Sequence, residues 1–96
     1  MALRNYEVTY ILDPTLGDDA VEGLKEKFSQ NVSSAGGEIQ DIKSWGKRRL
    51  AYELNGRLEG IYVTMRFDSD TGTAAELRRI MGLSDEVMRS MFVRTN

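Results

Sequence analysis

The sequence has 96 residues, of which 13 are Lys or Arg and 15 are Asp or Glu, so it carries a formal net charge of −2 and has room for one compact domain over residues 1–96. It contains neither cysteine nor histidine, which excludes disulfides, thiol nucleophiles, Ser-His triads and the commonest zinc ligands. No apolar run approaches the roughly 20 residues that cross a bilayer, and residues 1–6 lack the layout of a signal peptide. We therefore expect a cytoplasmic domain that is not an enzyme and has no cofactor, no metal and no membrane association.

The charges are distributed unevenly along the chain. Residues 1–42 hold three cations against eight acids, a net of −5, whereas residues 43–57 hold five cations against one acid, a net of +4. Residues 58–96 have a net charge of −1. Such a chain does not coat nucleic acid with its whole surface, but its one basic segment can dock on phosphate.

The first two elements follow from hydrophobic periodicity. Residues 5–12 alternate between two sides, which predicts a strand with one buried face. Residues 16–35 predict a helix, with Asp18 or Asp19 as its N-cap and Gly36-Gly37 at its end. The residues expected to face the core are Tyr6, Val8, Tyr10 and Leu12 in the strand and Val21, Leu24, Phe28 and Val32 in the helix.

Residues 38–55 predict a second, unusually long strand. Ile39, Ile42 and Trp45 recur every three residues, which no flat strand places on one face. A bulge or a strong twist near residues 41–44 would bring the three side chains together.

A hairpin and a third strand are expected next. Asn55-Gly56 is a strong hairpin-turn dipeptide, and we expect the loop to continue to Gly60. Residues 61–67 then alternate again, with Ile61, Val63, Met65 and Phe67 on one side.

The last part of the chain predicts a short helix and a fourth strand. Thr73 and Glu76 have the spacing of a capping box, and Gly82 ends the helix. Residues 68–72 resemble the start of a calcium loop, but Arg79 stands where the closing Glu should be, so a turn that caps the helix is expected instead. With residues 87–95 as the final strand, the order is β-α-β-β-α-β. This order predicts an α+β, ferredoxin-like split β-α-β fold, with both helices on one face of a four-stranded antiparallel sheet.

Two stretches carry candidate functional residues. Lys47, Arg48 and Arg49 are adjacent cations that phosphate would compensate, although a charged edge strand that prevents aggregation is the alternative. Trp45 and Tyr52 flank them and are suited to stacking on bases or on a protein. In the last strand, Phe92 and Met88 are the better core pair. That choice leaves on the open face of the sheet Arg89 and Met91, beside Arg66 and Tyr62.

The sequence resembles the bacterial small-subunit ribosomal protein six family. The resemblance rests on four stretches that occur in the family's order and together cover essentially the whole chain. These are residues 4–7, Asp13-Pro14, residues 45–52 and residues 87–95. Many members have Pro after the Ala-Tyr pair where this chain has Glu53, so the hairpin edge is expected to pair differently.

The resemblance implies a structural role in the small ribosomal subunit and no catalytic activity. It implies that the protein pairs with small-subunit ribosomal protein eighteen and that the pair binds the central domain of the small-subunit rRNA. Under this interpretation the rRNA contacts are Arg4, Lys47, Arg48, Arg49, Arg89 and Arg94. The candidates for the protein partner's surface are Trp45, Tyr52, Tyr62 and Met91.

Three rival interpretations use the same topology. A ferredoxin-like regulatory or ligand-binding domain would homodimerise through its open sheet, but the sequence offers no Gly-rich ligand loop. An acylphosphatase-like enzyme needs an anion-cradling loop with an Arg after the first strand, and residues 13–19 are acidic there. A standard RNA-recognition motif needs an aromatic-rich third strand, and residues 60–65 supply one aromatic.

Overall fold

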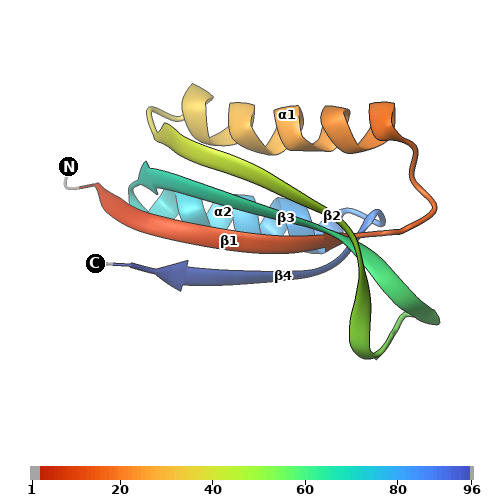
Figure 1. Cartoon of the computed structure of the whole chain (residues 1–96). Coiled ribbons are helices and arrows are strands. Elements are labelled where there is room, and N and C mark those ends of the chain that lie inside the picture. Colours follow the sequence, from red (N-terminus) through yellow and green to blue (C-terminus); the bar gives the residue numbers. More distant parts are fainter. Residues whose placement is uncertain (1–2, 96) are drawn as a thin grey trace.

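The computed structural model describes residues 3–95 as a four-stranded antiparallel sheet with two helices on one face (Figure 1). Residues 1, 2 and 96, the ends of the domain predicted over residues 1–96, lie outside the described residues. The elements in chain order are β1 (Arg4–Leu12), α1 (Asp18–Ser34), β2 (Glu38–Leu54), β3 (Arg57–Ser69), α2 (Thr71–Leu83) and β4 (Val87–Arg94). The strand order is β2-β3-β1-β4, which confirms the predicted fold class.

One hydrophobic core lies between the helices and the covered face of the sheet. The alternation predicted for β1 and β3 is correct, because Val8, Tyr10 and Leu12 are fully buried, as are Val63 and Met65. From the helices the core receives side chains spaced by helical turns, namely Val21, Phe28 and Val32 from α1 and Ala74, Leu77 and Met81 from α2. Burial of this kind stabilises a domain by roughly 25 cal/mol for each Å² of apolar surface removed from water.

Helix α1 begins two residues later than predicted and ends one residue earlier. Gly17 is the N-cap and makes no side-chain hydrogen bond, so Asp18 and Asp19 are first-turn residues whose charge faces the positive end of the helix dipole. At the other end, the Gly37 N–H donates to the Val32 carbonyl. A side chain at Gly37 would meet Val32 and the Asp68 backbone within 3 Å, so this position also requires close approach.

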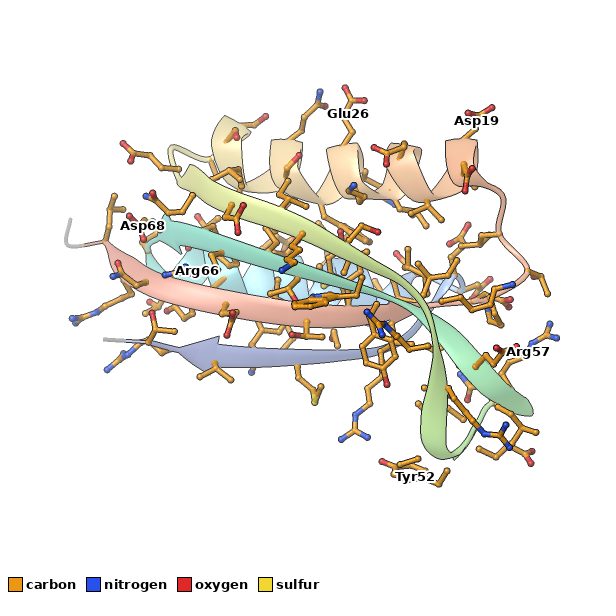
Figure 2. All side chains as sticks on the ribbon, viewed as in Figure 1. Asp19, Glu26, Tyr52, Arg57, Arg66 and Asp68 are labelled. Atoms are coloured by element: carbon orange, nitrogen blue, oxygen red, sulfur yellow. The ribbon has the colours of Figure 1, made fainter. Side chains whose placement is uncertain are left out.

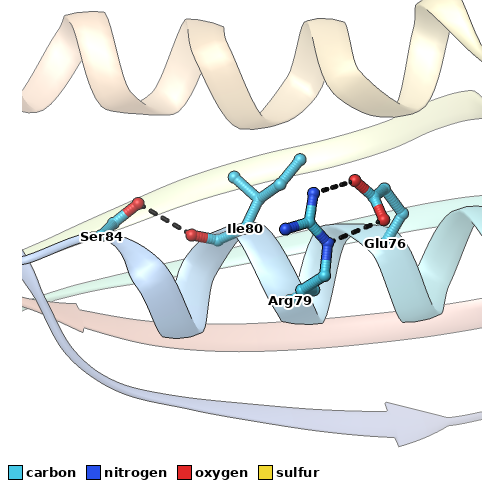
Figure 3. A network of polar contacts seen from close by, with 4 residues as sticks. All are labelled: Glu76, Arg79, Ile80 and Ser84. Atoms are coloured by element: carbon cyan, nitrogen blue, oxygen red, sulfur yellow. Dashed lines mark hydrogen bonds and ion pairs between the residues drawn. The ribbon is translucent and has the colours of Figure 1, made fainter.

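The helix α2 begins one turn earlier than predicted. Its N-cap is Asp70, whose carboxylate accepts a hydrogen bond from the Thr73 N–H at 2.7 Å, so Thr73 is not the cap. The prediction that residues 68–72 form a capping turn is therefore confirmed. The helix runs to Leu83, past Gly82, and the Ser84 hydroxyl donates to the Ile80 carbonyl at its end while Arg79 pairs with Glu76 on its surface (Figure 3).

Two bulges in β2 lie on either side of the predicted segment. The register with β3 shifts between Ile39 and Asp41 and again between Ser44 and Gly46. The first bulge puts Ile39 and Ile42 on the covered face, as expected. The second shift takes effect only at Gly46, which has a positive φ of 76°, so ordinary alternation after Ile42 leaves Trp45 on the opposite face. Trp45 therefore does not share a face with the two isoleucines.

The turn after β2 is shorter than predicted. Asn55 and Gly56 both have positive φ, the geometry of a two-residue type I′ turn, and Leu54 pairs directly with Arg57. The loop does not continue to Gly60, because residues 57–60 already belong to β3. Residues 49–59 form a projecting ribbon, here called the hairpin arm, which extends beyond the rest of the sheet (Figure 1). A third register shift in β2 lies within it, between the Arg49–Glu59 pair and the Leu54–Arg57 pair.

A bulge in β4 changes which residue joins the core. Its register with β1 shifts between Ile11 and Leu12, so Leu12 pairs with Val87 and Met88 is the extra residue. Val87, rather than the predicted Met88, packs with Phe92 against the core. Within the described residues, no helix is long and apolar enough to span a membrane.

Candidate nucleic-acid and protein interface

The open face of the sheet carries a mixture of aromatic, cationic and hydroxyl side chains. The registers place Tyr62 and Arg89 on either side of Ile11 in one row across the strands. In the next row, Thr64 and Met91 flank Thr9. Directly opposed residues of an antiparallel pair share a face, so the three strands present one continuous surface with no helix over it.

Trp45 is held against this surface by contacts of its side chain. Its indole Nε1–H donates to the Thr64 hydroxyl at 3.0 Å, and the Thr64 and Thr9 hydroxyls are 3.4 Å apart. The Lys43 Nζ lies 4.0 Å from the centre of the Trp45 ring, within the range of a cation–π interaction. Although these contacts hold the ring in place, 44% of Trp45 remains exposed. A rigid, exposed aromatic of this kind is typical of an interface anchor.

The hairpin arm folds across the open face and reaches β4. The Arg89 guanidinium donates to the Tyr52 hydroxyl, although β2 and β4 are separated by two strands in the sheet. Leu50 is buried on this side, and a side chain at Gly60 would clash with Ile11, so the arm packs closely over the first row. The result is a cleft of about 110 Å³ between the arm and β4, lined by Ile11, Leu50, Ala51, Tyr52, Leu54, Tyr62, Arg89 and Met91.

The structure therefore brings Tyr52, Tyr62 and Met91 together around one cleft, while Trp45 lies farther along the same face. Ile11 and Leu50 belong to the cleft but were not predicted from the sequence. The available signal was Ile11 itself, an apolar side chain on the outward side of the first strand.

The three adjacent cations of β2 do not form one patch. Arg48 pairs with Gly60, whose outward side faces Ile11, so Arg48 lies on the open face, where its Nε–H donates to the Trp45 carbonyl at 3.2 Å. Lys47 and Arg49, its neighbours in the strand, lie on the other side. Lys47 lines two grooves beside Pro14, on the helix-covered side.

Arg4 and Arg94 lie together at the opposite end of the sheet. Arg4 begins β1, Arg94 pairs with Tyr6, and the Thr95 N–H donates to the Asn5 carbonyl at 2.8 Å. The same end carries Arg66 and Asp68, far from Tyr52 and Arg57 on the hairpin arm (Figure 2). Arg89 belongs to neither group of cations, since it lies at the cleft.

The six arginines and lysines predicted to contact RNA make no ion pair within residues 3–95. The ion pairs found there join Lys25 to Glu22, Arg79 to Glu76 and Arg57 to Asp13. Hydrogen bonds from Thr15, with the nearby Arg57 charge as a smaller cause, lower the pKa of Asp13 below its ordinary value. None of the six cations therefore forms an ion pair with a carboxylate in residues 3–95, although Glu59 lies directly opposite Arg49 in the strand register. In residues 3–95, no three metal-ligating side chains form a cluster.

Comparison with known proteins identifies the class. The model of the family described as Ribosomal protein S6 matches residues 5–94. The chain is 46% identical to small ribosomal subunit protein bS6 of Desulforamulus reducens over 92 residues, which cover 96% of this chain and 97% of the relative. It is 42% identical to the bS6 protein of Thermoanaerobacter pseudethanolicus over 94 residues, 98% of this chain and 99% of that one.

The solved structures agree in fold. The crystal structure of 30S ribosomal protein S6 from Thermotoga maritima superimposes with a TM-score of 0.90 at 26% identity, covering 97% of this chain and 88% of that one. The C-terminal domain of the MgtC protein from Mycobacterium tuberculosis, at 16% identity and a TM-score of 0.68, shares the fold alone.

These matches define a structural protein of the small ribosomal subunit, not an enzyme, and they place it in the cytoplasmic ribosome of bacteria. The chain belongs to the ribosomal protein S6 family, as the sequence resemblance indicated. Membership implies association with rRNA within the ribosome.

Proposed function

We propose that residues 1–96 act as a single domain that binds the central domain of the small-subunit rRNA together with small-subunit ribosomal protein eighteen. The observation that carries this proposal is the separation of two kinds of surface. Cations without an ion pair in residues 3–95 lie at the two ends of the sheet, Arg4 and Arg94 at one end and Lys47, Arg48 and Arg49 at the base of the hairpin arm. Exposed aromatic and apolar side chains lie between them on the open face and the arm, so RNA and a protein have largely separate places to bind, with Arg48 at the border.

Five of the predicted cations are suited to phosphate contacts. Arg4 and Arg94 present one pair of cations, and the hairpin arm and its base present the others, Lys47, Arg48 and Arg49. Because the three β2 cations point to both sides of the strand, they fit a phosphate backbone that passes around the arm rather than one that lies on a single face. Each cation that neutralises a phosphate releases counterions, which makes binding depend on salt concentration.

The net charge explains why a partner is needed. A protein with a net charge of −2 has weak long-range attraction to RNA, so a basic partner must supply much of the electrostatic affinity. Trp45, Tyr52, Tyr62 and Met91 give that partner an exposed, partly rigid surface on the open face. Aromatic residues and methionine are enriched at protein interfaces, which supports this role.

The test is a binding titration on a central-domain rRNA fragment at several salt concentrations, with and without purified protein eighteen. We expect weak, salt-sensitive binding by this protein alone and much tighter binding when both proteins are present. Equal affinity in both conditions would contradict joint binding. No binding in either condition, together with a stable homodimer, would instead favour a regulatory domain that dimerises through its open sheet.

A further inference from the structure

The cleft under the hairpin arm differs from the rest of the open face because the side chain at its base is already shielded from water. Ile11 is only 3% exposed, although no helix covers this side of the sheet. Leu50 from the arm packs over it, and Tyr52 is held in place by its hydrogen bond to Arg89. The walls are thus fixed before any partner arrives, which reduces the entropy lost on binding.

The side chains at the rim of the cleft are apolar but remain exposed to water. Tyr52 is 59% exposed and Met91 is 42% exposed, so both leave carbon surface in water on either side of the opening. One further side chain bound in the cleft would bury the exposed carbon surface of both Tyr52 and Met91. Hot spots of protein interfaces have this form, an anchor side chain in a preformed pocket.

The positive charge of Arg89 beside the cleft indicates which chemical groups can bind there. Arg89 makes one hydrogen bond, to Tyr52, and no ion pair within residues 3–95, so most of its five N–H donors have no protein partner there. A carboxylate beside the apolar anchor would satisfy that guanidinium with a charge-assisted hydrogen bond. A nucleobase fits less well, because the walls are mainly carbon and offer few groups that could read a base edge.

We propose that this cleft receives one large aliphatic or aromatic side chain of the partner protein, next to an acidic residue that pairs with Arg89. The proposal rests on the proposed function and specifies the chemistry of its protein contact. It also moves Arg89 from the phosphate contacts to the protein contacts, in keeping with its place at the cleft.

The first experiment measures the affinity of purified protein eighteen for cleft variants by isothermal titration calorimetry, without RNA. Tyr52→Ala removes one wall and should weaken binding about tenfold or more, whereas Tyr52→Phe keeps the ring and should weaken it only about threefold or less. Leu58→Ala is the matched control, since Leu58 is equally exposed at 58% on the same arm but lies outside the cleft. It should bind within about twofold of the parent protein.

A variant that fills the cleft distinguishes insertion of a partner side chain into the cleft from a flat contact of the partner with the sheet surface. Met91→Trp should block the cleft and weaken binding about tenfold or more, while a flat contact would gain area and bind as well or better. Binding by Met91→Trp at parental strength would therefore overturn the proposal and leave joint binding intact. If the parent protein itself does not bind protein eighteen, both the proposed function and the cleft proposal fail.

The charge is tested with Arg89→Gln, and Arg79→Gln on α2 is the control. Arg89→Gln should weaken protein binding about fivefold and reduce its salt dependence, whereas Arg79→Gln should change neither. If Arg89→Gln instead weakens binding to the rRNA fragment alone and leaves protein binding unchanged, Arg89 is a phosphate contact and the proposal is wrong.

Discussion

The two faces of this one sheet differ in almost every physical property. On the covered face, Tyr10 of β1 packs edge-on against Phe28 of α1, and neither has exposed surface. On the open face, Trp45 and Tyr52 are each held by a hydrogen bond and keep about half of their surface in water. Because the side-chain period of a strand is two, neighbouring residues of one strand serve opposite purposes. The comparison shows that stability and recognition are encoded in alternate positions.

The largest expected effect is a difference in the free energy of unfolding between variants of the covered face and variants of the open face. Phe28→Ala empties a site where Phe28 packs edge-on against Tyr10, and it should lower the free energy of unfolding by about 3–5 kcal/mol. Trp45→Ala removes one hydrogen bond and a half-exposed ring, so it should cost about 1 kcal/mol while abolishing much of the partner binding. Urea denaturation measures both. Equal losses of stability would contradict the division between the faces.

The next prediction concerns the cations on the hairpin arm and at its base. Replacing Lys47, Arg48 and Arg49 together with Gln should reduce the salt dependence of rRNA binding by up to about three phosphate contacts. A salt titration of the complex with protein eighteen measures this slope. An unchanged slope, with new self-association, would assign the three cations to protection of the β2 edge.

A smaller effect is expected inside the core. The Tyr10 hydroxyl is buried and has no hydrogen-bond partner within the described residues, so Tyr10→Phe should raise the free energy of unfolding by up to about 1 kcal/mol. Burial, with a contribution from Glu22, raises the pKa of Tyr10 well above its ordinary value of 10.0. The unfolded chain therefore ionises first, and the advantage of Phe should grow above pH 10. Urea denaturation at pH 7 and above pH 10 tests both statements, and a destabilised Phe variant would show that the hydroxyl has a partner.

The smallest expected effect is at the start of α2. The hydrogen bond from the Thr73 N–H is the main cause that lowers the pKa of Asp70, so this cap stabilises the fold above the ordinary carboxyl pKa and is lost as the pH falls through the lower folded value. Asp70→Ala should lower the melting temperature at pH 7, and the difference should disappear in strong acid. The exposed Asp85 offers a control, since Asp85→Ala removes no cap. A difference that persists in strong acid would contradict the assignment.

The sequence predicted the covered face better than the open one. Periodicity correctly identified Val8, Phe28 and Met65 as core residues, because the regular spacing of apolar side chains in each element assigns them to the covered side. The same logic failed at Met88 because a bulge adds one residue to β4 there, and it failed at Trp45 because the register shift expected to return that side chain to the covered face takes effect only at Gly46.

The candidate site was predicted as residues but not as an arrangement. Tyr52, Tyr62 and Met91 were each identified, yet nothing local in the sequence indicates that the hairpin arm folds across two strands to reach β4. That contact depends on the twist of the arm and on close packing at Gly60, which are tertiary properties. The family resemblance supplied the class of function, whereas the structure showed that Arg89 contacts Tyr52 at the cleft.

The most direct test of the central claim uses the single tryptophan of the chain. Its indole N–H gives one resolved signal in a ¹⁵N-labelled NMR spectrum, and in the structure that N–H donates to Thr64 on the open face. On titration with protein eighteen, we expect this signal and the amides of Tyr52, Tyr62 and Met91 to shift, while the outward amides of α1 stay in place. An unchanged indole signal with shifts concentrated on α1 and α2 would place the partner on the helices and contradict the account.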